Sequence, residues 1–154
     1  MAEHANIALL AELRRRQRAM YAGDATPEHV GELLAPEVVW HVPGRSPIAG
    51  DHRGTEAVQR YFDERRVLAG NTLRITPLQA MADDEVVVEL ADGTATLGGE
   101  AAHWRTTGVY RIAGGRIAEA WLVPLDLAAF DAAWCRAGDA ERRRGPAPGA
   151  ASAE

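Results

Sequence analysis

Residues 38–54 read VVWHVPGRSPIAGDHRG, an apolar strand that runs into a loop broken by prolines and glycines. Successive side chains of a strand point to opposite faces, so His41 shares its face with Val39, and Trp40 and Val42 lie on the other. We expect the imidazole of His41 to lie against a hydrophobic interior. Histidine ordinarily exchanges a proton near neutral pH, which makes His41 a candidate acid or base. The alternative is a core or edge histidine that bonds a backbone carbonyl.

The composition is typical of one folded domain. A chain of 154 residues, 47% of them hydrophobic, can bury about 68–70% of its unfolded surface in a single core. One cysteine, Cys135, allows no intramolecular disulfide and no zinc cluster, so we expect a cytoplasmic protein without a metal. The N-terminal segment lacks the charge order of a secretion signal, and we expect no membrane span. A net charge of -5 argues against a nucleic-acid partner.

Several reaction classes are excluded by what the chain lacks. Its basic residues are all arginines, so no lysine can form a Schiff base. The sequence contains no glycine-rich nucleotide loop, no zinc-protease motif and no serine nucleophile elbow. We therefore expect no cofactor.

Apolar periodicity and turn residues predict the order of the elements. Helices are expected over residues 6–22, 27–34 and 55–70. Strands are expected within residues 72–81, 85–96, 101–112 and 116–123, with bulges or bends at Gly93 and Gly108. Asp126 should cap a short C-terminal helix. We expect one domain over residues 1–137 and a disordered tail over residues 138–154. Helices followed by a curved antiparallel sheet define an α+β fold.

Three segments in this order resemble a known family: WHVPGRSPIAGDHRG (40–54), VYRIAGGRIAEAW (109–121) and PLDLAAFDAAW (124–134). They resemble the nuclear transport factor 2-like superfamily, in its SnoaL-like polyketide cyclase and ketosteroid isomerase-like branch, over roughly residues 7–134. The resemblance implies a cone-shaped half barrel, in which three N-terminal helices close a curved, mainly antiparallel sheet around a deep apolar pocket. It also implies a homodimer packed through the outer face of the sheet.

The resemblance implies two catalytic candidates. In ketosteroid isomerases a carboxylate base lies on the strand after the second helix, and His41 takes that position here. The oxyanion-hole tyrosine of the first helix corresponds to Arg16, which also falls on an apolar stripe with Leu13 and Met20. Desolvation would lower the pKa of His41 and make it a base, and Arg16 would stabilise an enolate or bind a carboxylate. The alternative for Arg16 is a side chain that reaches solvent at the edge of the core.

The chain also departs from the family's patterns. Gly108 stands near the position of the isomerases' second oxyanion donor, an acid. Leu122 follows Trp121 where SnoaL-like cyclases commonly carry a catalytic aspartate, and the Asp, Arg, Asp set of limonene epoxide hydrolases is missing. Glu89, a charge within a strand, is expected to form an ion pair on the outer face or at the dimer interface.

Aromatic residues are the candidates for the pocket walls. The substrate-binding candidates are Trp40, Tyr61, Trp104 and Tyr110, with the core as the alternative role. Trp104 is favoured because it shares a strand face with Thr106. His52, in the loop at the mouth, is a further ligand contact, or part of a solvated turn.

These features predict a small cofactor-independent cyclase or isomerase of secondary metabolism, for example antibiotic biosynthesis. It would act on a polyketide-like hydrophobic intermediate by acid/base catalysis in an apolar pocket. One alternative is a non-catalytic small-molecule-binding or dimeric scaffold protein of the same fold. Another is cyclisation by confinement, in which His41 only orients the substrate. The expected partners are a hydrophobic small molecule and a second copy of the chain.

Overall fold

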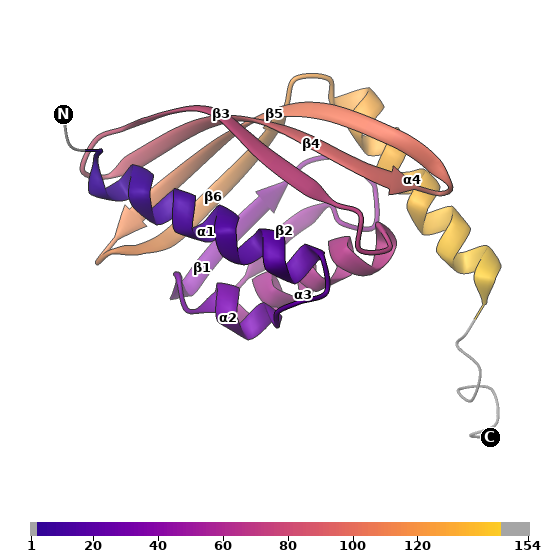
Figure 1. Ribbon diagram of the computed structural model, residues 1–154, viewed down its shortest axis with the longest axis horizontal. Coiled ribbons are helices and arrows are strands. Elements are labelled where there is room, and N and C mark those ends of the chain that lie inside the picture. The colour runs from indigo at the N-terminus through magenta and orange to yellow at the C-terminus, as the bar shows by residue number, and fades with distance from the viewer. Residues whose placement is uncertain (1–2, 146–154) are drawn as a thin grey trace.

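One curved sheet of six strands, closed on its concave side by helices, forms the body of the computed structural model, which describes residues 3–145 (Figure 1). The strands are β1 (Leu34–Val42), β2 (Gly50–Arg53), β3 (Arg74–Ala82), β4 (Val86–Leu97), β5 (Glu100–Ala113) and β6 (Arg116–Pro124). The helices are α1 (Ala5–Tyr21), α2 (Pro27–Gly31), α3 (Thr55–Leu68) and α4 (Leu127–Arg144). The expected α+β class is confirmed.

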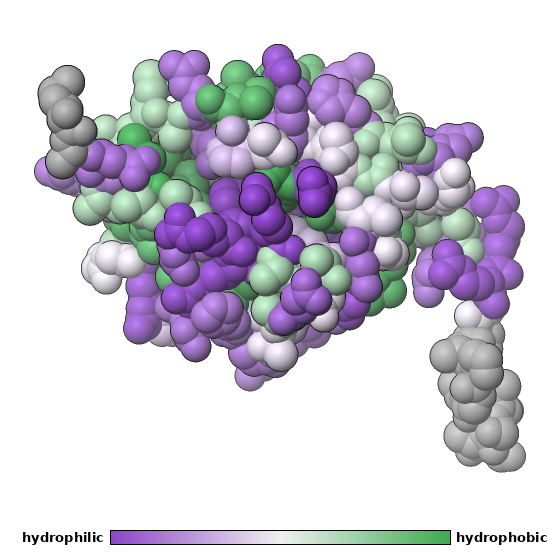
Figure 2. All heavy atoms as spheres, in the orientation of Figure 1, coloured by the Kyte–Doolittle hydropathy of each residue, from purple (hydrophilic) through white to green (hydrophobic). Residues whose placement is uncertain are grey.

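The strand order is β2-β1-β6-β5-β4-β3. Strands β1 and β6 run parallel, and every other pair is antiparallel. Helices α1, α2 and α3 lie beneath the arch of the sheet, and α4 projects beyond its end (Figure 1). The face that carries α1 is mainly hydrophilic (Figure 2). The apolar core therefore lies between this helical layer and the concave face of the sheet.

Alternation along the strands sorts the side chains between the two faces. On β1, Val38, Trp40 and Val42 are buried, whereas Val39 and His41 are half-buried. The long strands β4 and β5 alternate in the same way over most of their lengths. Strand β2, which we expected to be loop, pairs with β1 and extends the sheet by one edge strand. Helix α2 is shorter than expected because the chain enters β1 at Leu34.

Two glycines make room for aromatic rings on the concave face. A Cβ atom on Gly93 would lie 2.3 Å from the indole of Trp104, and one on Gly108 would lie 2.5 Å from the hydroxyl of Tyr110. Of the two features expected at these glycines, a bulge or a bend, the bulge is absent, because the β4–β5 register is unbroken through both positions. Glycine is needed here because any larger side chain would overlap a ring.

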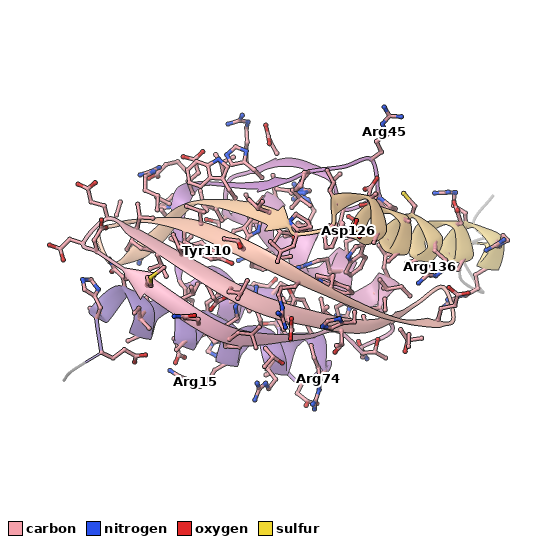
Figure 3. All side chains as sticks on the ribbon, turned by 90° about the horizontal axis from the view of Figure 1, so that it is seen from above. Arg15, Arg45, Arg74, Tyr110, Asp126 and Arg136 are labelled. Atoms are coloured by element: carbon pink, nitrogen blue, oxygen red, sulfur yellow. The ribbon has the colours of Figure 1, made fainter. Side chains whose placement is uncertain are left out.

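Helix α4 is longer than the sequence pattern predicted. Asp126 caps it as expected, since its Oδ1 accepts a hydrogen bond from the Ala129 amide at 3.0 Å (Figure 3). The helix continues to Arg144, so the predicted tail over residues 138–144 is wrong, and residues 146–154 lie outside the described part of the chain. Alanine, glutamate and arginine favour helix even where no apolar stripe continues. Asp131 also accepts the backbone amides of Arg45 and Ser46, which ties α4 to the β1–β2 loop.

Candidate functional site

A small cavity lies between the concave face of the sheet and helices α1 and α3. Its volume is about 20 Å³, room for roughly one water molecule. The apolar part of its lining includes Trp40, Trp104 and Leu122. Polar groups reach it from both layers, and they are Arg14, Arg65, Thr106 and Tyr110. The cavity therefore combines aromatic walls with an unusual concentration of hydrogen-bond donors.

Arg14 of α1 is the centre of a buried polar network. Its Nε and Nη2 atoms donate to Oε1 of Glu89 at 3.0 and 2.6 Å, and Nη1 donates to Oε1 of Gln17 at 2.6 Å. Nη2 also donates to the hydroxyl of Tyr110 at 2.7 Å. The side chains of Arg14 and Glu89 are only 9% and 4% exposed, so this ion pair is shielded from water. Its bonds hold the guanidinium in one orientation at the cavity wall.

Tyr110 is set up as a hydrogen-bond donor to the cavity. Burial raises the pKa of Tyr110, and the nearby charge of Arg14 only partly offsets this effect. The phenol therefore stays protonated near neutral pH. Because its oxygen already accepts from Arg14, its own hydrogen is free for another acceptor. Tyr110 is buried and lies within the outline of the sheet in Figure 3, whereas Arg15 and Arg74 extend outward on the side of α1.

Arg65 of α3 approaches the same cavity from the helical layer. The residue is 4% exposed and donates a hydrogen bond from Nη2 to the hydroxyl of Tyr21. Its guanidinium carbon lies 4.7 Å from the ring centre of Tyr61 and 5.2 Å from that of Tyr21. Within residues 3–145 its Nε has no hydrogen-bond partner.

His41 lies on the opposite face of the sheet from the cavity, and our expectation that it faces the interior is wrong. Val38, Trp40 and Val42 occupy the inward positions of β1, which turns His41 outward. There its ring stacks on Trp121 at 5.4 Å between centroids. Nδ1 lies 2.7 Å from Oδ1 of Asp51, and Nε2 lies 2.6 Å from Oε2 of Glu119.

This arrangement favours the charged form of His41. A carboxylate ion only accepts hydrogen bonds, so both ring nitrogens must donate. Burial opposes protonation, but the hydrogen bonds to Glu119 and Asp51 outweigh it and raise the pKa of His41. The expected lowered pKa is therefore wrong, because the ring lies between two carboxylates rather than in an apolar pocket.

The expectation that Arg16 faces the pocket is also wrong. Its side chain pairs with Glu12 and Glu32 on the helical surface, at 3.0 Å in each case. The arginine at the cavity is Arg14, because the buried face of α1 includes Leu10, Gln17 and Tyr21. Together with Arg14 these residues follow the helical spacing of four, three and four, a signal that the sequence does contain.

The aromatic and loop candidates are divided between the cavity and the core behind it. Trp40, Trp104 and Tyr110 line the cavity. Tyr61 is buried but lies outside the lining, and His52 stacks on its ring at 4.5 Å. The Nε2 atom of His52 lies 2.9 Å from the carbonyl oxygen of Ile48. His52 thus packs against α3 from strand β2 rather than forming part of a mouth loop.

Sequence reasoning missed Arg14 and Arg65, and it misplaced Glu89. We expected the ion pair of Glu89 on the outer face or at an interface, but the residue is 3% exposed and its partner is Arg14. Glu89 alternates with Val87 and Ala91, both buried, which was a usable signal for an inward position. Among residues 3–145, no cluster of three or more histidine, cysteine or acidic residues can hold a metal ion. No helix within that range is long and apolar enough to cross a membrane.

Comparison with known proteins gives a consistent family. A model of the SnoaL-like domain matches residues 13–120. The structure of Bal32a, from a soil-derived mobile gene cassette, is 32% identical with a TM-score of 0.72, over 82% of this chain and 97% of that one. A protein of unknown function with a cystatin-like fold from Xanthomonas campestris is 25% identical with a TM-score of 0.68, over 80% and 96%.

TerC, co-crystallised with polyporic acid, shares the fold at 17% identity and a TM-score of 0.69, over 84% of this chain and 98% of that one. The search of curated proteins found no match.

Breaking the buried ion pair between Arg14 and Glu89 should strongly destabilise the folded protein. Glu89→Leu leaves the Arg14 guanidinium buried without its carboxylate, and we expect a loss of about 3–5 kcal/mol in the free energy of unfolding. The double variant Arg14→Met/Glu89→Leu should recover most of it, because no unpaired charge remains. Urea unfolding measures both, and Glu32→Leu, which removes an exposed partner of Arg16, serves as the control. A loss from Glu89→Leu no larger than the control's contradicts the role given to this pair.

The bridge between two carboxylates should make His41 a pH-dependent contributor to stability. Its pKa in the folded protein is raised above 6.5, so its stabilisation is fully present below that value and is lost as pH rises through the folded pKa. His41→Gln should therefore destabilise the protein more at about pH 6 than at about pH 9. His103→Gln, on the same outer face with a 60% exposed ring, is the control. Resonances of the His41 ring should titrate with a midpoint above 6.5, and a midpoint at or below this value overturns the argument.

Proposed function

The chain belongs to the SnoaL-like domain family, and on this premise we propose that it is a cofactor-independent cyclase or isomerase of secondary metabolism. Its proposed substrate is a polyketide-like hydrophobic intermediate, bound between the sheet and helices α1 and α3. The observation that carries the proposal is the Arg14–Tyr110 pair at the wall of an aromatic cavity. Both groups donate hydrogen bonds, so together they favour negative charge on a substrate oxygen.

The proposed chemistry follows from the donors present. Ring closure or a double-bond shift next to a carbonyl passes through an enolate, whose charge lies mainly on oxygen. The proton that leaves the carbon would pass to a water molecule, for which the cavity has room. It would return to the alkoxide that ring closure forms, or to the carbon at the other end of the shifted double bond. Tyr110 would donate its hydroxyl hydrogen to the enolate oxygen, and Arg14 would polarise the phenol from behind. Glu89 would act as a positioning residue, since it holds Arg14 without lining the cavity. Trp40 and Trp104 would order a flat or folded substrate against the donors.

A single substitution at Tyr110 tests this mechanism. Tyr110→Phe keeps the ring and removes only the hydroxyl, so turnover should fall about 10²–10³-fold. Formation of a cyclised aromatic product from a linear poly-β-ketone thioester, followed by ultraviolet absorbance, measures the rate. His41→Gln is the matched comparison, because it separates this mechanism from one in which His41 is the base. Loss of turnover in His41→Gln with full activity in Tyr110→Phe contradicts the assignment.

A second candidate function is non-catalytic binding of a small molecule. It is favoured by the lining of the cavity, which includes no carboxylate and no imidazole among the described residues. The size of the cavity, about 20 Å³, favours neither function, because it must open before either a substrate or a bound ligand enters. Binding without turnover of the thioester, in wild type and in Tyr110→Phe alike, selects this alternative.

We also propose that two copies pair through the outer face of the sheet. Apolar side chains gather there, and they include Val88, Leu90, Val109, Trp121 and Val123. Val123, the last residue but one of β6, is 48% exposed, so part of this apolar surface is accessible to a partner.

Sedimentation analysis tests the pairing. The wild-type protein should be dimeric, and Val123→Arg should be monomeric because it places a charge on the apolar face. Val67→Arg on α3 is the control, since Val67 is equally exposed at 47% but lies away from the sheet. A monomeric wild type, or a dimer that persists in Val123→Arg, contradicts the proposal.

A further inference from the structure

The interior holds more positive charge than its own residues neutralise. Arg14 and Arg65 both line the cavity, and Glu89 is the carboxylate that pairs with Arg14. Arg65 forms no ion pair within residues 3–145, although it is 4% exposed. A guanidinium group stays protonated at every pH at which proteins are folded. The cavity therefore carries one unbalanced positive charge.

Stacking on aromatic rings offsets only part of the free energy that it costs to bury the charge of Arg65. Arg65 lies over the rings of Tyr21, Tyr61 and Phe62, and such contacts attract a cation. A buried charge nevertheless remains unfavourable until a countercharge and hydrogen-bond acceptors satisfy it. Elsewhere in this interior the chain supplies such a countercharge, because Glu89 accepts two bonds from Arg14. For Arg65 the residues that the structure describes supply a phenol oxygen alone.

Helices α1 and α3 carry three unsatisfied buried polar atoms among the described residues, and of these only the Arg65 atom belongs to the cavity lining. The Nε of Arg65, the Nε2 of Gln17 and the hydroxyl of Tyr61 are buried and have no hydrogen-bond partner within residues 3–145. Two of these atoms are obligatory donors, and the third can donate. Buried polar groups in folded proteins are nearly always hydrogen-bonded, so this interior calls for acceptor oxygens.

We propose that Arg65 binds an anionic group of the ligand, and that the natural ligand is a poly-β-ketone derivative that carries both a flat aromatic ring system and a carboxylate. The planar guanidinium matches a carboxylate in shape and charge. The indoles of Trp40 and Trp104 provide faces for a flat ring system. This inference rests on the proposed function, since it names the substrate class for the same cavity. It gives Arg65 the task of binding, while Arg14 and Tyr110 act on the reacting oxygen.

Calorimetric titration with a matched pair of probes tests the inference. The probes are 2-naphthoate and its neutral counterpart 2-naphthamide, which differ little in shape. The wild-type protein should bind the acid at least about tenfold more tightly than the amide, because a hydrogen bond to a charged group is gained. Arg65→Met should remove this preference. Arg16→Met removes the same unit of charge from the surface of α1 and should leave the preference unchanged.

Each outcome decides the question. Equal binding of acid and amide by the wild type overturns the anion site while the small-molecule pocket stands, and this comparison needs no variant to fold. If Arg65→Met still prefers the acid over the amide, the anion site at Arg65 is also overturned. The same holds if Arg16→Met loses this preference to the same extent as Arg65→Met. If neither probe binds, the anion site and the proposed pocket fail together. Arg65→Lys, which keeps the charge, should retain part of the preference and excludes loss of packing as the cause.

Discussion

The burial of two arginines with one carboxylate constrains this interior more strictly than its aromatic rings do. Rings of similar volume can replace one another in a core at modest cost, whereas an unpaired buried charge costs several kcal/mol. Glu89 meets this constraint for Arg14 by accepting from both Nε and Nη2. The guanidinium is thereby fixed, and it in turn fixes the hydroxyl of Tyr110. The chemistry proposed for the cavity depends on this chain of contacts, which begins with a residue that does not touch the cavity.

Each face of the sheet carries a cationic side chain bonded to carboxylate, but the two sites differ in exposure and in the kind of cation. On the outer face, His41 joins Asp51 and Glu119 in a row across strands β2, β1 and β6. Two carboxylates here face one imidazole, and the histidine side chain is 24% exposed. On the inner face, Arg14 and Glu89 are almost fully enclosed. The positive charge of the outer row is therefore lost as pH rises, whereas the guanidinium of Arg14 keeps its charge.

Much of the fold follows from the sequence, because long strands with regular alternation and helices with capped ends leave few options. The alternation of Trp40 and His41 was also predictable, but not which of them faces inward, since that depends on strands distant in sequence. On α1 the choice between Arg14 and Arg16 depended on the phase of the helix. The stripe of Leu13 and Met20 pointed to Arg16, but the buried face is wider and also includes Leu10 and Gln17, which flank Arg14. Strand β2 has only four residues and forms because β1 is available beside it. Arg65 follows Val58 and Phe62 at helical spacings of four and three, but this signal is easily discounted because an arginine within an amphipathic helix ordinarily faces water.

The identity of the lining groups also limits which reactions this interior suits. Among the described residues that line the cavity there is no carboxylate and no imidazole. A strong base is therefore lacking where the substrate would lie. A carbon acid between two carbonyl groups needs less help from a base, because its enolate is already delocalised over two oxygens. What such a substrate requires is a site that stabilises the oxygen charge and holds the chain in a folded shape. Tyr110, kept protonated by burial, and Arg14, kept in place by Glu89, meet the first requirement, and the indoles of Trp40 and Trp104 meet the second. A poly-β-ketone therefore suits this interior better than a simple ketone, whose less acidic C–H bond requires the base that the lining lacks.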